Sequence, residues 1–482
     1  MSAKQAVARA QLVHEPGVAH SPAPASAAPN ISHLQACIED ARQAALDGDQ
    51  GPADPTDFND LRSRLETARS KFPPLYRQEF VEPYIAAIDG LGAQKFSDIL
   101  IQDPSRESTA GLLLDMAHAI LQRSERFQLR ATNAFQEVVG DLYDGFLSAE
   151  DRQGVNPPDL GTTPPLMKWG NPDFGPYTWP ADATKSFGAH AGVVNLPPAN
   201  ARKGMLAWSA LGHETGGHDI LHADNGLQNQ LAAAVQLALA DMGDDLADYW
   251  SSRIDETAAD VLGILNMGPA AAIGLVGYFR GLNKAFTGVA KLRSGGPAND
   301  PHPADIVRGY LAAEVIALLP FSQHAAWTGI IAAETDKDAG NVNLAGISLD
   351  QAKARESARR VANAIANTKV HSLENHSLGS IQTWRDSDEI KVDIVRKVLV
   401  TAGDVPDQGP SRIYATHVVA AAVIEALANG TDIPTIFDRM ISILAKMHDK
   451  NPVWGPLFVR HPGNIRRDRA YVPQLRLVAE ND

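Results

Sequence analysis

Along most of the chain, apolar residues recur every three or four positions, with polar and charged residues between them. This spacing is typical of amphipathic helices, and it predicts one helix across 58–91 and one or two more across 109–147. Gly90 and Gly92 are expected to end the first of these. Helical spacing resumes near residue 202 and continues toward the C-terminus. The pattern therefore predicts a mainly α fold with a small β element.

The segment 156–198 interrupts the helical pattern with prolines, glycines and several aromatic residues. Disordered linkers seldom hold so many aromatic side chains, so we expect an irregular but ordered segment. Within it, the run Ala191 to Leu196 is the best candidate for a strand, and the two prolines that follow would close it.

A chain of 482 residues is too long for one simple core, so we expect two or three structural units. The Ala/Pro/Ser-rich segment 1–31 is predicted to be a disordered tail. We expect an N-terminal helical region at 32–154, a core carrying the chemistry at 155–310 and a C-terminal helical region at 311–482.

Charge and composition narrow the function. A formal net charge of -14 argues against a nucleic-acid binder. The single cysteine, Cys37, excludes an internal disulfide framework, so the ligands of any bound metal must be His, Asp or Glu. The sequence contains no run of about 18 apolar residues, so we expect no membrane span. The N-terminus lacks the apolar run of a signal peptide. We therefore expect a cytoplasmic protein, while the oligomeric state stays open.

The strongest chemical signal is the sequence His213-Glu214-Thr215-Gly216-Gly217-His218. Two imidazoles followed by a third ligand, with a Glu as general base, suit a catalytic zinc site. The two histidines stand five residues apart, which misaligns them by about 140° on a regular helix. A π-type bulge can absorb the extra residue, and Gly216 and Gly217 would make that distortion cheap.

A second predicted helix, 249–262, supplies further candidates. Glu256 and Asp260 are four residues apart and share one face of it. Glu256 can complete the metal site, while Asp260 can accept a proton from a ligating imidazole and fix its tautomer. His222 competes as third ligand, because it stands four residues after His218. A site of three histidines therefore stays open.

Together, the two motifs resemble those of the gluzincin zinc metallopeptidases, and the five-residue His spacing resembles that of the dipeptidyl peptidase III family. The resemblance covers about 192–308, a quarter of the chain. It implies a Zn²⁺ ion held by His213, His218 and Glu256, and a peptide or protein substrate. It also implies that Glu214 activates water and that Asp260 orients His213.

Two further segments gain a role from this resemblance. The strand candidate would be the edge strand that pairs with an extended substrate, through Gly192, Val193, Val194 and Asn195. The segment from Asp300 to Arg308 resembles the His-Pro…Arg segment of some membrane-associated zincins. His302 or Arg308 would then stabilise the oxyanion of the tetrahedral intermediate.

Two other functions compete. The adjacent His218 and Asp219 are similar to the His-Asp pair of HD-type metal-dependent phosphohydrolases, with His190 upstream and Asp260 or Asp305 as the distal carboxylate. This alternative leaves Glu214 and Glu256 without a task. The long helical flanks are also compatible with a non-enzymatic, partner-binding protein.

Overall fold

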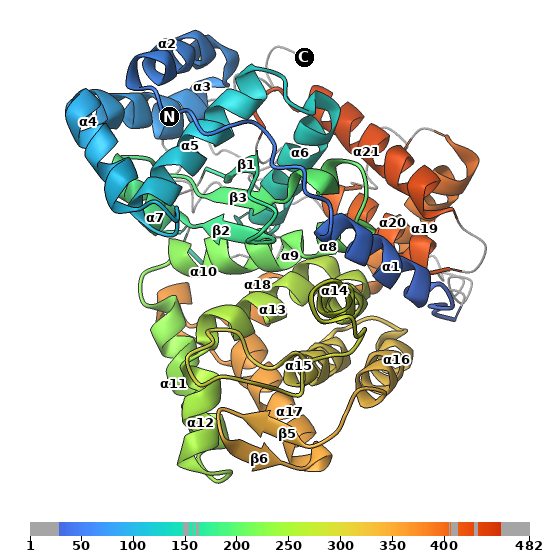
Figure 1. Cartoon of the computed structure of the whole chain (residues 1–482). Coiled ribbons are helices and arrows are strands. Elements are labelled where there is room, and N and C mark those ends of the chain that lie inside the picture. Colours follow the sequence, from blue (N-terminus) through green and yellow to red (C-terminus); the bar gives the residue numbers. More distant parts are fainter. Residues whose placement is uncertain are drawn as a thin grey trace, which may run out of the picture.

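The computed structural model describes residues 28–147, 154–156, 158–160, 163–403, 405, 413–428 and 432–454. Most of the predicted tail, 1–31, lies outside these residues. Over the described residues the protein is mainly helical, with two small three-stranded sheets (Figure 1). The prediction of a mainly α fold with a small β element is confirmed.

The N-terminal helices are α1 (Leu34–Ala45), α2 (Phe58–Ala68), α3 (Pro74–Tyr76), α4 (Glu82–Gln102), α5 (Thr109–Ser124) and α6 (Leu129–Leu147). Short helical turns, η1 (Arg69–Lys71) and η2 (Arg77–Val81), separate α2 from α4. The expected single helix 58–91 is therefore wrong. Two adjacent prolines at 73–74 interrupt it, because proline has no N–H for the helical hydrogen bond.

The helix end expected at Gly90 and Gly92 is confirmed at Gly92. Its φ of +68° and ψ of 168° are not helical, so α4 consists of two helices that meet there, and the second runs to Gln102. Phe96, beyond the kink, is buried against the N-terminal helices, which holds the second half of α4 in place. Gly92 thus ends the first of these helices, and the second follows it directly.

The first sheet consists of β1 (Leu166–Trp169), β2 (Tyr177–Trp179) and β3 (Val193–Leu196), in the order β1-β3-β2. β3 runs parallel to β1 and antiparallel to β2, and all four of its residues are buried. The prediction that the strand beginning near Gly192 is an edge strand is wrong, since both of its sides are already paired. Among the described residues, β2 keeps an outer edge without a partner strand.

This sheet lies between two layers of helices. α5 packs on the face of the sheet that bears Leu166 and Val193. A bent helical rod runs across the other face, where α6 joins it in one core with Met167, Trp169, Val194 and Leu196 (Figure 1). The rod comprises α8 (Met205–Ser209), α9 (Leu211–His213), η5 (Glu214–Asp219) and α10 (Ile220–Ala223). It in turn packs on α13 (Ile254–Met267), while α14 (Pro269–Thr287) and α15 (Asp305–Leu318) pack behind α13.

The remaining elements are short helical turns, a second sheet and further helices. In the sequence, α7 (Ala181–Thr184) and η3 (Lys185–Phe187) lie between β2 and β3, and η4 (Pro198–Ala201) lies between β3 and α8. The second sheet has the order β4 (Gly295–Gly296), β5 (Val342–Leu344), β6 (Ile347–Leu349). The other helices are α11 (Leu227–Leu239), α12 (Asp244–Ser251), α16 (His324–Asp336), α17 (Gln351–Asn367), η6 (His371–Leu373), α18 (Leu378–Ile381), α19 (Asp386–Thr401), α20 (Ala415–Leu427) and α21 (Ile433–Asp449).

Contacts cross the region boundaries expected near residues 154 and 310. α21 packs on α6, α1 on α14, and α20 on α8. One apolar core accordingly includes residues of α1, α6, α14 and α21, while a second core is formed around α2, α4 and α5. Of the helices that the structure describes, none combines the length and the apolar character needed to cross a membrane.

Candidate metal centre

Glycines bring the two helices of the candidate site into backbone contact. A Cβ on Gly263 of α13 would lie 2.8 Å from the backbone nitrogen of His213. A Cβ on Gly217 would lie 2.5 Å from the Cα of Ala259. Larger residues at these positions would push the helices apart, so the glycines set the short distance across which the side chains of the site meet.

The rod is π-helical from Glu214 to Asp219, which confirms the bulge predicted at Gly216 and Gly217. The wider turn places His213 and His218 on the same side, although they are five residues apart. Their Nε2 atoms are separated by 3.0 Å. The extra residue thus does what a regular helix does with a spacing of four.

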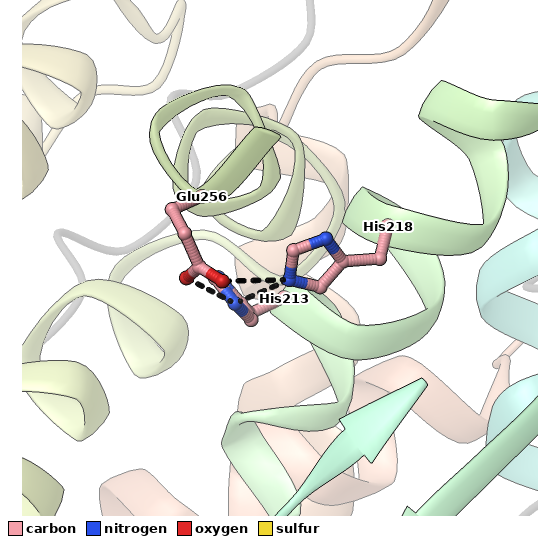
Figure 2. A group of neighbouring side chains, drawn as sticks. All are labelled: His213, His218 and Glu256. Atoms are coloured by element: carbon pink, nitrogen blue, oxygen red, sulfur yellow. Dashed lines mark hydrogen bonds and ion pairs between the residues drawn. The ribbon is translucent and has the colours of Figure 1, made fainter. Parts of the chain in front are cut away.

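Glu256 of α13 completes a compact group with these two histidines (Figure 2). His213, His218 and Glu256 are called the ligand group below, because together they could hold a metal ion. One carboxylate oxygen lies 3.4 Å from Nε2 of His213 and the other lies 3.5 Å from Nε2 of His218. A tetrahedron with zinc–ligand distances of about 2.0–2.1 Å has edges of about 3.3–3.4 Å. Two imidazoles and a carboxylate are also a donor set that catalytic zinc sites use. The three residues therefore fit a zinc ion.

Asp260 supports His213 from behind. Its Oδ1 lies 2.8 Å from Nδ1 of His213. Arg308 of α15 donates two hydrogen bonds to the same carboxylate, at 2.7 and 2.8 Å. Burial alone would raise the pKa of Asp260, but Arg308 and His213 outweigh it and lower the pKa. Asp260 is thus a charged carboxylate that occupies Nδ1 of His213, which leaves Nε2 of His213 facing Glu256 and His218.

Arg308 lies against the carboxylates of the site and also lines the cleft described below. Its side chain is 3% exposed, and its guanidinium is held by Asp260 and stacked 4.6 Å from the ring centroid of Phe279. It also lies 3.6 Å from Glu256. Arg308 therefore neutralises and positions the carboxylates of the site. Its role at the oxyanion, which the resemblance implies, stays a prediction.

Asp255 supports His218, and the sequence analysis assigned it no role. Its Oδ1 lies 3.2 Å from Nδ1 of His218. His222 also contacts Asp255 and is not a member of the ligand group: its Nε2 lies 3.2 Å from Asp255 and its Nδ1 2.9 Å from Asp182. Both nitrogens of His222 are engaged elsewhere, which argues against the three-histidine alternative.

Glu214 lies beside the ligand group and is buried. The hydroxyl of Thr178, in β2, donates a hydrogen bond of 2.8 Å to Oε2 of Glu214. The residues on either side of Thr178 point to the other face of the strand, where Tyr177 and Trp179 donate to Asp115 of α5 at 2.7 and 2.8 Å. Asp115 therefore anchors β2 in the register that turns Thr178 toward Glu214.

His302 reaches the site from the loop before α15, as the sequence analysis expected. Its Nε2 lies 3.3 Å from Glu256 and its Nδ1 lies 3.0 Å from Asp300. The side chain is half-exposed, at 49%. It can therefore be reached by a molecule that approaches the ligand group.

A cleft of about 870 Å³ opens onto these residues. One side is formed by the segment from Phe174 to Pro180, which contains β2. The other side is formed by α14, whose lining residues Leu275, Phe279, Leu282 and Phe286 recur at helical spacing. Tyr278 also lines the cleft, and burial raises its pKa, with a smaller contribution from Glu214. This phenol is a neutral hydrogen-bond donor that the sequence analysis missed.

The residues of the HD-type alternative do not meet. Asp219 is turned away from the ligand group and packs so closely on Gly192 that a Cβ there would collide with its Oδ1. Burial raises the pKa of Asp219 to about 7. His190 is exposed and is not among the residues that line the cleft. The geometry therefore offers no metal site built on His218 and Asp219.

No protein-family model, no curated protein and no solved structure matches the chain. The resemblance to gluzincins accordingly stands on the motif residues alone, and the functional argument depends on the geometry of the site.

Proposed function

We propose that this protein is a zinc-dependent hydrolase, specifically a metallopeptidase that cleaves peptide bonds. The observation that carries the proposal is the ligand group of His213, His218 and Glu256, whose spacing suits tetrahedral zinc, at a cleft that also holds Glu214. Zinc bound there would act as a Lewis acid that makes water more acidic and polarises a carbonyl group.

The protein's own residues supply the proton transfers. Glu214 accepts a proton from the attacking water and later delivers it to the nitrogen of the leaving amine. Thr178 orients the Glu214 carboxylate through its 2.8 Å hydrogen bond. Tyr278, His302 and Arg308 line the cleft and are side chains that can donate to the carbonyl oxygen as it gains negative charge.

The walls of the cleft favour an extended peptide. Within the part of the chain that the structure describes, the outer edge of β2 pairs with no other strand, so a substrate can add there as a further strand. The apolar row on α14, from Leu275 to Phe286, faces the same space and suits an apolar substrate side chain. With a net charge of -14, the protein is a poor match for nucleic-acid substrates.

Zinc analysis and one conservative substitution test the proposal. We expect one zinc per chain in the wild type by elemental mass spectrometry, and none in His218→Ala. Glu214→Gln should keep the zinc and lose about 10²–10⁴-fold in turnover of a peptide library, because the general base is gone. Glu356→Gln, on the surface of α17, is the matched control and should behave as wild type.

Two results would contradict the proposal. A wild-type chain without zinc, or a His218→Ala variant that keeps it, would remove the metal centre and leave the partner-binding alternative. Full peptidase activity in Glu214→Gln would place the chemistry elsewhere.

A further inference from the structure

His222 has both ring nitrogens engaged by carboxylates. Nδ1 lies 2.9 Å from Oδ2 of Asp182 and Nε2 lies 3.2 Å from Oδ1 of Asp255. Carboxylates accept hydrogen bonds, so a ring nitrogen donates to each of them when it carries a proton. The side-chain amide nitrogen of Gln228 also lies 2.8 Å from Nε2. Burial would lower the pKa of His222, but the hydrogen bonds to Asp182 and Asp255 outweigh it and raise the pKa to about 10.

The two carboxylates belong to different parts of the cleft. Asp182 lies in α7, which follows β2 after a single proline, and it forms part of the wall beside that strand. Asp255 lies at the start of α13 and directly precedes the ligand Glu256. His222 itself lies in α10, one turn beyond the ligand His218. Its ring thus connects the substrate-side wall with the metal-bearing helices.

Asp255 carries this connection to the metal centre. Its Oδ1 lies 3.2 Å from Nδ1 of His218, 3.2 Å from Nε2 of His222 and 2.7 Å from the amide nitrogen of Gln228. One oxygen atom therefore serves all three partners. The position of that oxygen decides how the His218 ring is turned, and His222 helps to fix it.

We propose that His222 is a positioning residue of the metal centre, which holds the His218 ring in its ligating orientation by bridging Asp182 of the cleft wall to Asp255. The inference rests on the proposed function and extends it, because it makes the wall beside β2 part of the support of the metal. Since Asp182, His222 and Asp255 all line the cleft, a substrate that reaches this end touches the support itself.

Zinc affinity measured on the full chain tests the proposal, with competition against a chromophoric chelator. Loss of such an outer hydrogen-bond partner typically weakens metal binding by 10–100-fold. We expect about a tenfold loss in His222→Gln and a similar loss in Asp182→Asn. The double variant should be no weaker than His222→Gln alone, because both residues act through one chain of hydrogen bonds.

His118→Gln is the matched control. It removes another His–carboxylate pair, the 3.1 Å contact with Asp54, and neither residue lines the cleft. Its zinc affinity should equal that of the wild type. The absorption spectrum of Co²⁺ bound in place of Zn²⁺ adds a readout of ligand geometry: it should shift in Asp182→Asn and His222→Gln but not in His118→Gln.

Unchanged zinc affinity and an unchanged Co²⁺ spectrum in Asp182→Asn would overturn the proposal. So would an equal loss of affinity in His118→Gln, which would trace the effect to general destabilisation. Absence of zinc from the wild type would instead overturn the proposed function, so the two failures are distinguishable.

Discussion

His213 and His218 lie on the same side of the rod, but the carboxylates that contact their Nδ1 atoms differ in burial and in pairing. Asp260, behind His213, has a side chain that is 0% exposed and is held by two hydrogen bonds from Arg308. Asp255, behind His218, has a side chain that is 44% exposed and shares one oxygen among three partners. We call Asp260 with Arg308 the closed support, because both side chains are buried and paired with each other. We call Asp255 the open support, because it lines the cleft.

Because of this difference, we expect the closed support to affect the stability of the fold and the open support to affect metal binding. A buried carboxylate costs several kcal/mol unless a partner neutralises it, so Asp260 and Arg308 must be kept as a pair. A half-exposed carboxylate stays hydrated, and the loss of one partner costs the fold little. We therefore expect changes around His213 to act on the fold, and changes around His218 to act mainly on the metal.

The largest effect should come from breaking the closed support. Arg308→Met leaves Asp260 buried without its cation, and we expect a loss of about 3–5 kcal/mol in the free energy of unfolding. Urea unfolding of the zinc-free protein measures it. The double variant Arg308→Met/Asp260→Asn removes the stranded charge and should regain part of the loss. A loss below about 1 kcal/mol in the free energy of unfolding of Arg308→Met would contradict this role of the Asp260–Arg308 pair.

An intermediate effect should come from the glycines between the two supports. Gly217→Ala would place a Cβ 2.5 Å from the Cα of Ala259, and we expect a loss of about 1–3 kcal/mol as the helices separate. Gly216→Ala meets only the side-chain amide of Asn266, at 3.1 Å, which can shift. Its change should stay within about 1 kcal/mol, because alanine also favours helix. Thermal unfolding of both variants checks the order, and equal losses would contradict it.

The smallest effect concerns the open support and pH. The pKa of His222 is raised to about 10, from 6.5. A raised pKa adds stability that is complete below pH 6.5 and is lost as the pH rises through 10. The free energy of unfolding of wild type should exceed that of His222→Gln by about 1 kcal/mol at pH 6, since the His222 side chain is partly exposed. The difference should vanish above pH 10. A difference that is constant with pH would contradict the charged state of the ring.

Much of the closed support could be predicted from the sequence, because it follows from regular spacing. The pairing of Glu256 with Asp260 depends only on the helical period, and the π turn was indicated by the conflict between the five-residue His spacing and the two adjacent glycines. Asp255 was missed for the same reason. It precedes Glu256 by one residue, so on an isolated helix it points about 100° away from the ligand face. Only the position of the rod against α13 shows that it meets His218.

The β elements were predicted less well. β2 has three residues, too few for an alternating pattern to stand out among the surrounding prolines and aromatics. Its role as the free edge depends on sheet order, which the pairing of distant segments decides. The hairpin of β5 and β6, with Ala345 and Gly346 at positive φ in its turn, was likewise hidden in a region expected to be helical.

The π turn also constrains how this motif can change over evolution. Deleting Gly216 or Gly217 would restore the four-residue His spacing, yet it would rotate everything after it by about 100°. Ile220 and Leu221, each 1% exposed, would turn out of the core, and His222 would leave Asp182. Returning these residues to their places would require an inserted residue between His218 and Ile220 that compensates for the deletion. The six-residue motif from His213 to His218 is therefore difficult to shorten, because the packing of Ile220 and Leu221 depends on its length.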